Sequence, residues 1–455
     1  MIFPVADGRE LDATRSCPVP GAGTGAAHGA DPWDPLDLFG ASFVRDPHPW
    51  LDRLRAEAPV HHDPRTGLWL VSRHQDVKRV LLDTDRFLPD NAQNAVTPLP
   101  VAVMRILVRA GFTLPPALAN NGTPSHAGLR RVVTRFFDAR SVATAVPVIE
   151  RIAEELLDEV AERATAPDEF DLFAPFAQVL PCRVLLELLG IQGVDPATLI
   201  AWSDAALELF WGSPPPARQR ELAVLVAEFH QWLAAVVRAG TAPPGSFVRA
   251  LADHRLPDGT PLDAATAVAA CFFVFVAGQS TTGQLIATVL HRALAEPGVW
   301  PRAAEEAGMA EAWVEEVLRR EPPVTTWRRV TAEATRLGGV DLPAGAQVLL
   351  MLMGSGSDPA VFPDPELMCP GRANARRHLA FGAGRHLCPG ATLARTEAAV
   401  ALRAAARRLP AVRAADASAE PPMLGLLSFR APLRVAVERA STGEGAPSGP
   451  ARNAR

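Results

Sequence analysis

A single cysteine lies in a glycine-rich segment that runs from His378 to Arg395 and reads HLAFGAGRHLCPGATLAR. Its glycines at positions 382, 384 and 390 let the backbone turn tightly and approach a flat ligand closely. The pattern after the cysteine, Cys388, predicts a helix. A thiol at a helix N-terminus meets free N–H groups and the positive end of the helix dipole, which lower its pKa and favour the thiolate. That arrangement suits a metal ligand, whereas a lone cysteine can equally be a small core residue in a turn.

A second group of polar residues interrupts the most apolar part of the chain. Residues 277–282 read Ala-Gly-Gln-Ser-Thr-Thr and fall within residues 263–292, which are apolar on every side of a helix. This pattern predicts a fully buried central helix. Serine and threonine inside a helix often hydrogen-bond to the backbone of the preceding turn, so the segment is either a local packing feature or part of a site.

Charged residues recur at helical spacing in two other places. Glu316 and Arg319 lie three residues apart on a helix that must end at the proline pair beginning with Pro322. Taken alone, they predict an exposed ion pair of little energetic weight. His126 and Arg130 lie four residues apart, so both side chains share one helical face and can reach the same group.

The cysteine segment resembles the haem-binding loop of the cytochrome P450 family, of the soluble bacterial type, at every defining position: Phe381-Gly382-x-Gly-x-His386-x-Cys388-x-Gly. The resemblance implies that Cys388 is the proximal iron ligand of haem b (iron protoporphyrin IX). It also implies that Phe381 packs beside the sulfur and that His386 hydrogen-bonds a haem propionate. Electron donation from a thiolate ligand favours O–O cleavage.

Three further segments match the same family in the right order. His126 and Arg130 are similar to its His-x-x-x-Arg motif, which faces the haem edge. The run Trp-Arg-Arg-Val at residues 327–330 resembles a strand whose arginine meets a propionate, and Arg329 is the better match. Glu316 and Arg319 resemble the Glu-x-x-Arg pair, which belongs to a structural network on the proximal side and is no catalytic dyad.

The polar segment of the central helix resembles the family's oxygen-binding signature, with one departure. Ala277 and Gly278 match the groove beside the iron, and Thr281 matches the alcohol that delivers protons to bound dioxygen. Ser280 stands where the family has an acid, although a carboxylate is the usual group for proton relay. We therefore expect proton delivery through Thr281, ordered water or the substrate, and outcomes other than simple hydroxylation remain open.

The fold class that these patterns predict is mainly α with small β-sheets, as one large domain with a buried haem. We expect this domain to span residues 31–440 and the Gly-, Ala- and Pro-rich ends, residues 1–30 and 441–455, to be disordered. No βαβ rhythm is present, which argues against a nucleotide-binding sheet. Amphipathic helices are predicted at residues 49–56, 75–82, 146–163, 217–239 and 392–408, and strands within residues 67–71 and 339–350.

Composition excludes several other classes of protein. Among 455 residues, 48% are hydrophobic and 21% charged, an ordinary globular balance, and the net charge of −5 argues against a nucleic-acid partner. The five cysteines are far apart and include no CxxC pair, which argues against a disulfide framework or a zinc site and favours the cytoplasm. The N-terminus has no signal-peptide pattern, and the apolar stretch at residues 264–278 is shorter than the ~20 residues that span a bilayer, so no membrane is expected.

The family resemblance also implies a substrate and partners. The pocket should be mostly apolar and suited to a small organic molecule, as in secondary-metabolite biosynthesis. Its walls should come from four segments, residues 88–120, 272–278, 324–327 and 424–429. Residues 88–120, expected to be irregular, are interpreted either as a lid or as an ordinary surface loop.

Electrons for O₂ activation must come from another protein, because the chain has no flavin, nicotinamide or ferredoxin motif. A ferredoxin or flavodoxin with its NAD(P)H reductase is expected, and arginines near the proximal face can attract an acidic partner. They are Arg130, Arg131, Arg135, Arg376, Arg377 and Arg385. Three alternatives stay open: a peroxide-driven haem-thiolate enzyme, an atypical coupling catalyst and a haem-binding sensor.

Overall fold

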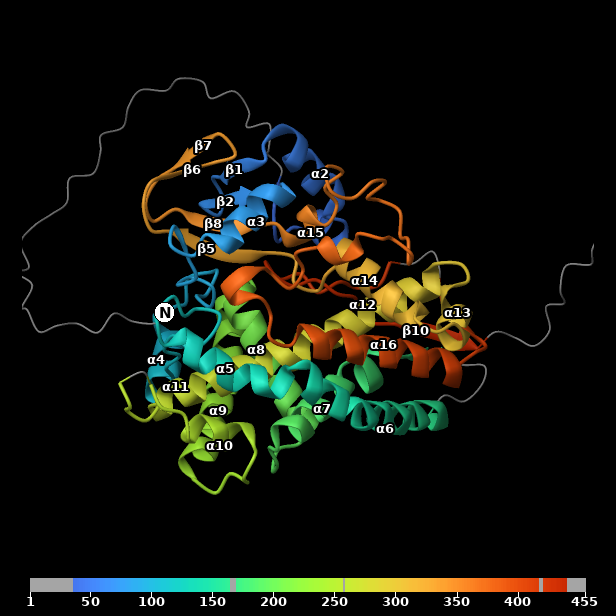
Figure 1. Ribbon diagram of the computed structural model, residues 1–455, viewed down its shortest axis with the longest axis horizontal. Coiled ribbons are helices and arrows are strands. Elements are labelled where there is room, and N and C mark those ends of the chain that lie inside the picture. The colour runs from blue at the N-terminus through green and yellow to red at the C-terminus, as the bar shows by residue number, and fades with distance from the viewer. Residues whose placement is uncertain (1–35, 164–168, 257, 417–419, 440–455) are drawn as a thin grey trace, which may run out of the picture.

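A computed structural model of the chain describes residues 36–163, 169–256, 258–416 and 420–439. The two ends predicted to be disordered, residues 1–30 and 441–455, lie outside this part of the chain. Most of the described residues are helical, and the helices fill the lower and right-hand parts of Figure 1. They comprise α4 (Val101–Arg109), α5 (His126–Phe137), α6 (Ala139–Arg163), α7 (Val179–Leu189), α8 (Pro196–Trp211), α9 (Pro216–Arg238), α10 (Phe247–Ala252), α11 (Ala264–Phe275), α12 (Thr281–Ala295), α13 (Val299–Glu305), α14 (Met309–Arg320) and α16 (Ala391–Arg408).

The smaller part of the molecule, at the top of Figure 1, contains the main sheet. Its strand order is β1 (Val60–Asp63), β2 (Leu68–Val71), β8 (Gln347–Leu350), β5 (Trp327–Thr331) and β3 (Phe87–Leu88). Only the β2–β8 pair is parallel. Helices α2 (His48–Glu57), α3 (His74–Leu82) and α15 (Leu352–Ser355) lie beside this sheet, and α1 (Ala41–Arg45) precedes them in the chain.

Two minor sheets complete the β-structure. A three-stranded sheet has the order β4 (Phe170–Asp171), β10 (Ala436–Arg439) and β9 (Val412–Ala414), and β6 (Thr335–Leu337) forms a hairpin with β7 (Val340–Leu342). Short helical turns of other types are η1 (Phe173–Ala177), η2 (Val276–Ser280), η3 (Ala375–Arg377) and η4 (Gly384–His386).

A continuous helical run from Ala264 to Ala295 passes through the middle of the helical part. Its start is set by Asp263, whose carboxylate accepts a hydrogen bond from the N–H of Thr266 and so caps α11. The run continues through the π-helical turn η2 into α12. By length and composition it could cross a membrane, but over half of its most apolar window is buried against neighbours that include α7, α8, α9, α14 and α16. Its apolar character is thus explained by its place in the core.

The predicted class, mainly helical with small sheets, is confirmed, and the main differences concern where elements begin. Helix α6 starts at Ala139, seven residues before the predicted start at residue 146, although it contains Pro147. Residues 88–120 are not irregular throughout, because they include α4, which packs against α9. Helix α4 is stabilised mainly by packing against another helix, and a short apolar helix of this kind gives only a weak amphipathic pattern in the sequence.

Candidate active site

The cysteine loop is closed by its own backbone. The N–H of Cys388 donates to the carbonyl oxygen of Phe381 at 2.9 Å, and the N–H of Leu387 donates to that of Gly384 at 3.0 Å. Gly382 and Gly384 have φ angles of 72° and 66°, in the left-handed region that glycine adopts without strain. The loop therefore needs glycine at both positions in order to present the thiol.

Cys388 lies three residues before Ala391, the first residue of α16. Burial raises the pKa of the Cys388 thiol, while the backbone N–H of Gly390 and the nearby Arg130 and Arg395 oppose this rise. The lowered pKa expected from the helix start is thus wrong for the protein without a bound metal, because desolvation of the thiolate outweighs the helix and the two cations. A coordinated metal ion removes the thiol proton outright, so the rise does not exclude a ligand role.

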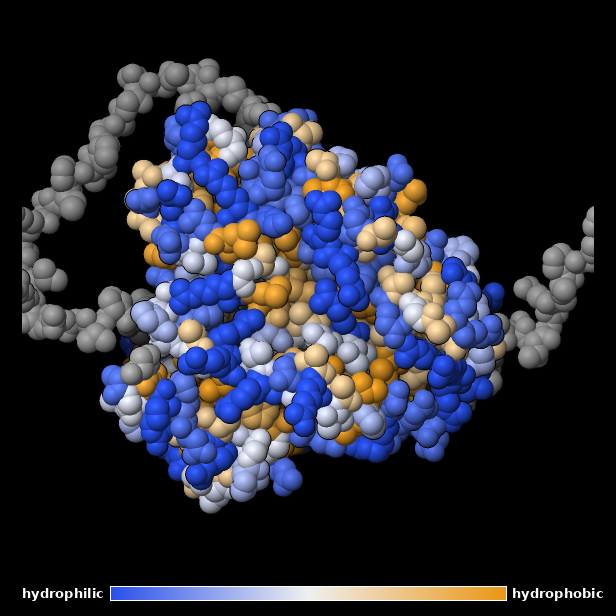
Figure 2. All heavy atoms as spheres, viewed as in Figure 1, coloured by the Kyte–Doolittle hydropathy of each residue, from blue (hydrophilic) through white to orange (hydrophobic). Residues whose placement is uncertain are grey.

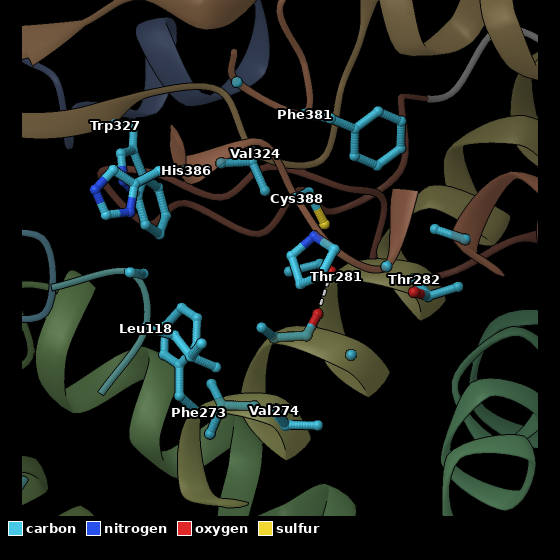
Figure 3. A pocket seen from close by; sticks show the side chains of 18 of the residues that line it. Leu118, Phe273, Val274, Thr281, Thr282, Val324, Trp327, Phe381, His386 and Cys388 are labelled. Carbon is cyan, nitrogen blue, oxygen red and sulfur yellow. Dashed lines mark hydrogen bonds between the residues drawn. The ribbon is translucent and has the colours of Figure 1, made fainter. Parts of the chain in front are cut away.

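Phe381 is held beside this loop by a cation–π contact. The guanidinium of Arg395 lies 4.5 Å from the centre of the Phe381 ring. Arg395 is fixed in turn by Glu315, which it contacts at 2.5 Å and which also binds His378 at 3.1 Å. Figure 3 shows Phe381 and Cys388 on the same side of the cavity.

Four basic side chains from three separate segments line the cavity that Cys388 faces. His126 and Arg130 come from α5, Arg329 from β5 and His386 from the cysteine loop. The rings of His126 and His386 lie 4.5 Å apart, and Arg385 donates from Nε to Nδ1 of His126 at 3.3 Å. The predicted site residues of these segments are therefore brought together.

Burial lowers the pKa of each member of this group, and nearby cations lower the pKa of the two histidines further. Burial, then Arg385 and Arg130, lowers the pKa of His126 to about 4. Burial, then Arg329 and other basic neighbours, lowers the pKa of His386 to about 3. Burial alone lowers the pKa of Arg329 to about 10, so this guanidinium stays charged at neutral pH.

In the part of the chain that the structure describes, these basic groups form no ion pair with an acidic side chain. Among the described residues, neither Arg130 nor Arg329 forms an ion pair with a carboxylate, and Nε of Arg329 and Nε2 of His386 are buried without a hydrogen-bond partner. A buried donor left unpaired costs about 1–3 kcal/mol, and more when it is charged. The cavity edge therefore fits a ligand that supplies carboxylates.

The opposite wall is formed by the π-helical turn η2 and the start of α12. Ala277, Gly278 and Thr281 line the cavity, and Thr281 donates from Oγ1 to the carbonyl oxygen of Ala277 at 2.5 Å. Figure 3 shows the sulfur of Cys388 directed toward this threonine. Ser280 does not line this cavity but faces the other side of the helix, where its hydroxyl donates to Asp204 at 3.3 Å.

The rest of the wall is apolar. Each of the four predicted pocket segments contributes to it, through side chains that include Leu118, Phe273, Val324, Trp327 and Phe429. The space between the walls, together with the open space at its mouth, is about 1520 Å³. Figure 2 shows apolar residues gathered at the centre of the face in view. A flat cofactor and an organic substrate can share a space of this kind.

Comparisons with known proteins agree with this geometry. Residues 238–409 match the family model of cytochrome P450. Cytochrome P450 107B1 of Saccharopolyspora erythraea is 34% identical over 84% of this chain and 92% of its own length. This chain belongs to the cytochrome P450 family. The erythromycin C-12 hydroxylase of the same organism is 32% identical over 78% of this chain and 84% of its own. The solved haem domain of the Tepidiphilus thermophilus P450 aligns with a TM-score of 0.80 and 29% identity, covering 89% of this chain and 96% of that one.

The chain is thus a cytochrome P450 monooxygenase, an oxidoreductase whose family binds haem. The unpaired buried donors of Arg329 and His386 fit the carboxylates of that cofactor, and the thiol of Cys388 fits its iron. Within the described residues no cluster of three or more histidine, cysteine or acidic side chains offers a competing metal site.

Glu316 and Arg319 of this P450 lie away from the cavity and are both fully buried. Arg319 donates to the two carboxylate oxygens of Glu316 at 2.8 and 3.0 Å, and Arg372 adds a bond to Glu316 at 2.9 Å. Arg319 also donates to the carbonyl oxygen of Gly356 at 2.8 Å. The prediction of an exposed pair, made from spacing alone, is therefore wrong, because both side chains are buried within one hydrogen-bonded network.

Glycine at position 356 has a steric reason. A Cβ atom at this position would lie 1.9 Å from the carbonyl oxygen of Arg319. Helix α14 and the turn at Gly356 approach too closely for any side chain there.

Sequence reasoning missed Asp204 and Arg385 as neighbours of the site. Asp204 lies on α8 and contacts Ser280, which is 76 positions further along the chain. The sequence places Arg385 among the arginines near the proximal face, and the structure shows in addition that it donates to His126. Neither contact has a local sequence signal, because each joins segments that only the tertiary fold brings together.

Proposed function

We propose that this P450 binds haem b with Cys388 as the iron ligand and with His126, Arg130, Arg329 and His386 around the propionates. One observation carries the proposal: the thiol faces an apolar cavity whose edge gathers buried cations and donors that lack acidic partners. Charge-assisted bonds to carboxylates would satisfy these donors. Bound haem supplies the centre at which O₂ is activated.

The neighbouring residues position the loop and the helix on either side of the cofactor. Phe381, held by its cation–π contact with Arg395, lies beside the cysteine loop, and Gly382 keeps the left-handed turn that directs the thiol inward. On the distal side, Ala277 and Gly278 supply a wall without bulky side chains. Thr281 holds a hydroxyl proton at Oγ1, where it is shared with the Ala277 carbonyl.

The substrate that fits this pocket is a small, largely apolar organic molecule. Leu118, Phe273, Val324 and Phe429 offer contact surface and no charge. By its name, one relative hydroxylates erythromycin, a product of secondary metabolism, and this supports a role in tailoring such compounds. A panel of candidate ligands, read as optical shifts of the haem band, tests the assignment, and binding restricted to anionic polar compounds would contradict it.

A separate redox protein is the proposed electron source, either a ferredoxin or a flavodoxin with its NAD(P)H reductase. Exposed arginines beside the cysteine loop and α5 would attract an acidic partner. They are Arg131, Arg135, Arg376, Arg377 and Arg385. The four cysteines within the described part of the chain are all free thiols, which supports a cytoplasmic location.

The test of the iron ligand is Cys388→Ala, with Cys369→Ala as the matched control. Cys369 is an exposed free thiol, so its loss leaves the haem environment unchanged. We expect the red-shifted Soret band of the ferrous CO complex to vanish in Cys388→Ala and to persist in the control. A band that survived in Cys388→Ala would overturn the ligand assignment.

A peroxide-driven enzyme is the second candidate, favoured by the absence of an acid at position 280. Product formation should be compared with ferredoxin, reductase and NAD(P)H on one side and hydrogen peroxide on the other. We expect turnover with the redox partner. Activity with peroxide alone would replace the first proposal by the second.

A further inference from the structure

The central helical run separates two cavities. Thr281 faces the haem-side cavity, whereas Ser280 and Gly283 face a second cavity between this run and α8. Leu207 of α8 borders both. A larger share of the side chains that line the second cavity is polar than in the haem-side cavity. The space inside it, including its opening, is about 950 Å³. It can therefore hold water.

The carboxyl group of Asp204 lies in the wall of this second cavity. Ser280 donates from Oγ to Oδ1 of Asp204 at 3.3 Å, and Gln178 donates from Nε2 to Oδ2 at 2.9 Å. In the described part of the chain, no arginine, lysine or histidine forms an ion pair with Asp204. A carboxylate without a cation, held by two neutral donors, is an unusual feature for a residue that has only a packing role.

The surroundings of Asp204 favour a proton on it. Burial raises the pKa of Asp204 to about 6, opposed by the bonds from Ser280 and Gln178 and reinforced by Glu208. Glu208 lies one turn along α8 and is paired with Arg218 of α9 at 2.8 Å. From α7 the only titratable neighbour is the buried thiol of Cys182, and the C-terminal segment contributes the apolar residues Leu424, Leu426 and Leu433.

We propose that Asp204 supplies, through Ser280, the carboxyl group that position 280 itself lacks, and that the second cavity is the route by which protons reach the distal side. The proposal rests on the monooxygenase function given above. A monooxygenation releases one oxygen atom of O₂ as water and therefore consumes protons at this side of the cofactor.

The proton transfer conserves charge and atoms. When Asp204 is protonated on Oδ1, the bond reverses: the carboxyl O–H donates to Oγ of Ser280 and passes its proton there, while the hydroxyl proton of Ser280 turns away and passes to a water molecule on the way to Thr281. Asp204, now a carboxylate, regains a proton from solvent through the second cavity. Asp204 acts through Ser280 and is a positioning and proton-supplying residue, not a catalytic one.

The test compares the full-length haem protein with Asp204→Asn, Asp204→Glu, Ser280→Ala and the control Glu221→Gln. Glu221 lies on the surface of α9, so its variant should behave as wild type. Proton relays contribute about 10²-fold or more to rates, so we expect Asp204→Asn and Ser280→Ala each to lower the rate of product formation by about 10²-fold. Asp204→Glu should restore most of it, and the wild-type rate should fall above about pH 6 while the Asn variant shows no such fall.

A readout independent of turnover is the infrared signal of a protonated carboxyl in the substrate-free protein. The part of this signal that titrates near pH 6 should be present in wild type and Glu221→Gln and absent in Asp204→Asn, whereas the part from buried Glu397, whose pKa is raised to about 8, should persist in all three proteins. If Asp204→Asn formed product as wild type does and showed a normal ferrous CO band, the relay would be overturned and the proposed function would remain intact. If the wild-type protein lacked the ferrous CO band, both proposals would be refuted. If Asp204→Asn does not fold, Ser280→Ala decides, since it leaves the carboxyl in place.

Discussion

Glu397 of α16 is a buried carboxyl group whose pKa should make stability depend on pH. It is 1% exposed, its Oε2 has no hydrogen-bond partner among the described residues, and α16 packs against α6, α12, α13 and α14. Burial raises the pKa of Glu397 from 4.5 to about 8. The folded chain therefore prefers the protonated form, whereas the unfolded chain ionises at ordinary pH.

The sign and size of the effect follow from linkage. Below pH 4.5 the group is protonated in both states and costs the fold nothing, and the cost then rises by about 1.4 kcal/mol per pH unit until the folded group also ionises near pH 8. Between pH 5 and pH 7 the cost grows by about 2.5 kcal/mol. Glu397→Gln cannot ionise, so its free energy of unfolding should gain about that amount over wild type across this interval.

The assay is equilibrium unfolding in denaturant at pH 5 and pH 7, followed by tryptophan fluorescence. Any desolvation cost of the new amide is the same at both pH values and cancels in the comparison. Glu305→Gln, at an exposed position of α13, is the control and should show no pH-dependent gain. If the difference between Glu397→Gln and wild type were equal at both pH values, the carboxyl would be ionised in the fold and the reasoning would fail.

Two further predictions concern the fold and the cofactor. Gly356→Ala should lower the free energy of unfolding by about 1–3 kcal/mol because its Cβ would overlap the carbonyl of Arg319, whereas Gly371→Ala, with no atom within 4 Å of its Cβ, should change it little in denaturant melts. Arg329→Leu should release haem more readily, seen as a lower ratio of Soret to protein absorbance after gel filtration, and retention equal to wild type would contradict its assignment to the propionates. Arg328→Leu is the matched control, since Arg328 binds backbone carbonyls outside the cavity.

The parts of the site that local sequence could predict are those built within one segment. The loop around Cys388, the shared face of His126 and Arg130 and the strand carrying Arg329 each follow from spacing over a few residues. Side chains alternate between the two faces of a strand, which explains why Arg328 and Arg329 of β5 contact different parts of the molecule. These patterns span only a few residues, so the local geometry of one segment decides which face carries the side chains, and the roles assigned to them stay predictions.

The remaining features depend on the tertiary fold. The contact of Ser280 with Asp204 joins η2 to α8, and the direction of the Cys388 pKa depends on how completely the surrounding segments exclude water. Helix α4 and the early start of α6 likewise rest on packing against other helices. Burial and contacts between distant segments depend on how the whole chain folds, so hydrophobic periodicity in the sequence cannot predict them.

The ring of basic donors at the cavity edge has a consequence for the protein before its cofactor arrives. In the described part of the apoprotein, Nε of Arg329 is buried without a hydrogen-bond partner where β5, α5 and the cysteine loop meet. This unpaired group lowers the stability of the folded apoprotein. Anything that binds only the folded state shifts the folding equilibrium toward it. Cofactor supply should therefore govern the cellular lifetime of this chain, with newly made molecules that miss their haem opening more often and reaching proteases first.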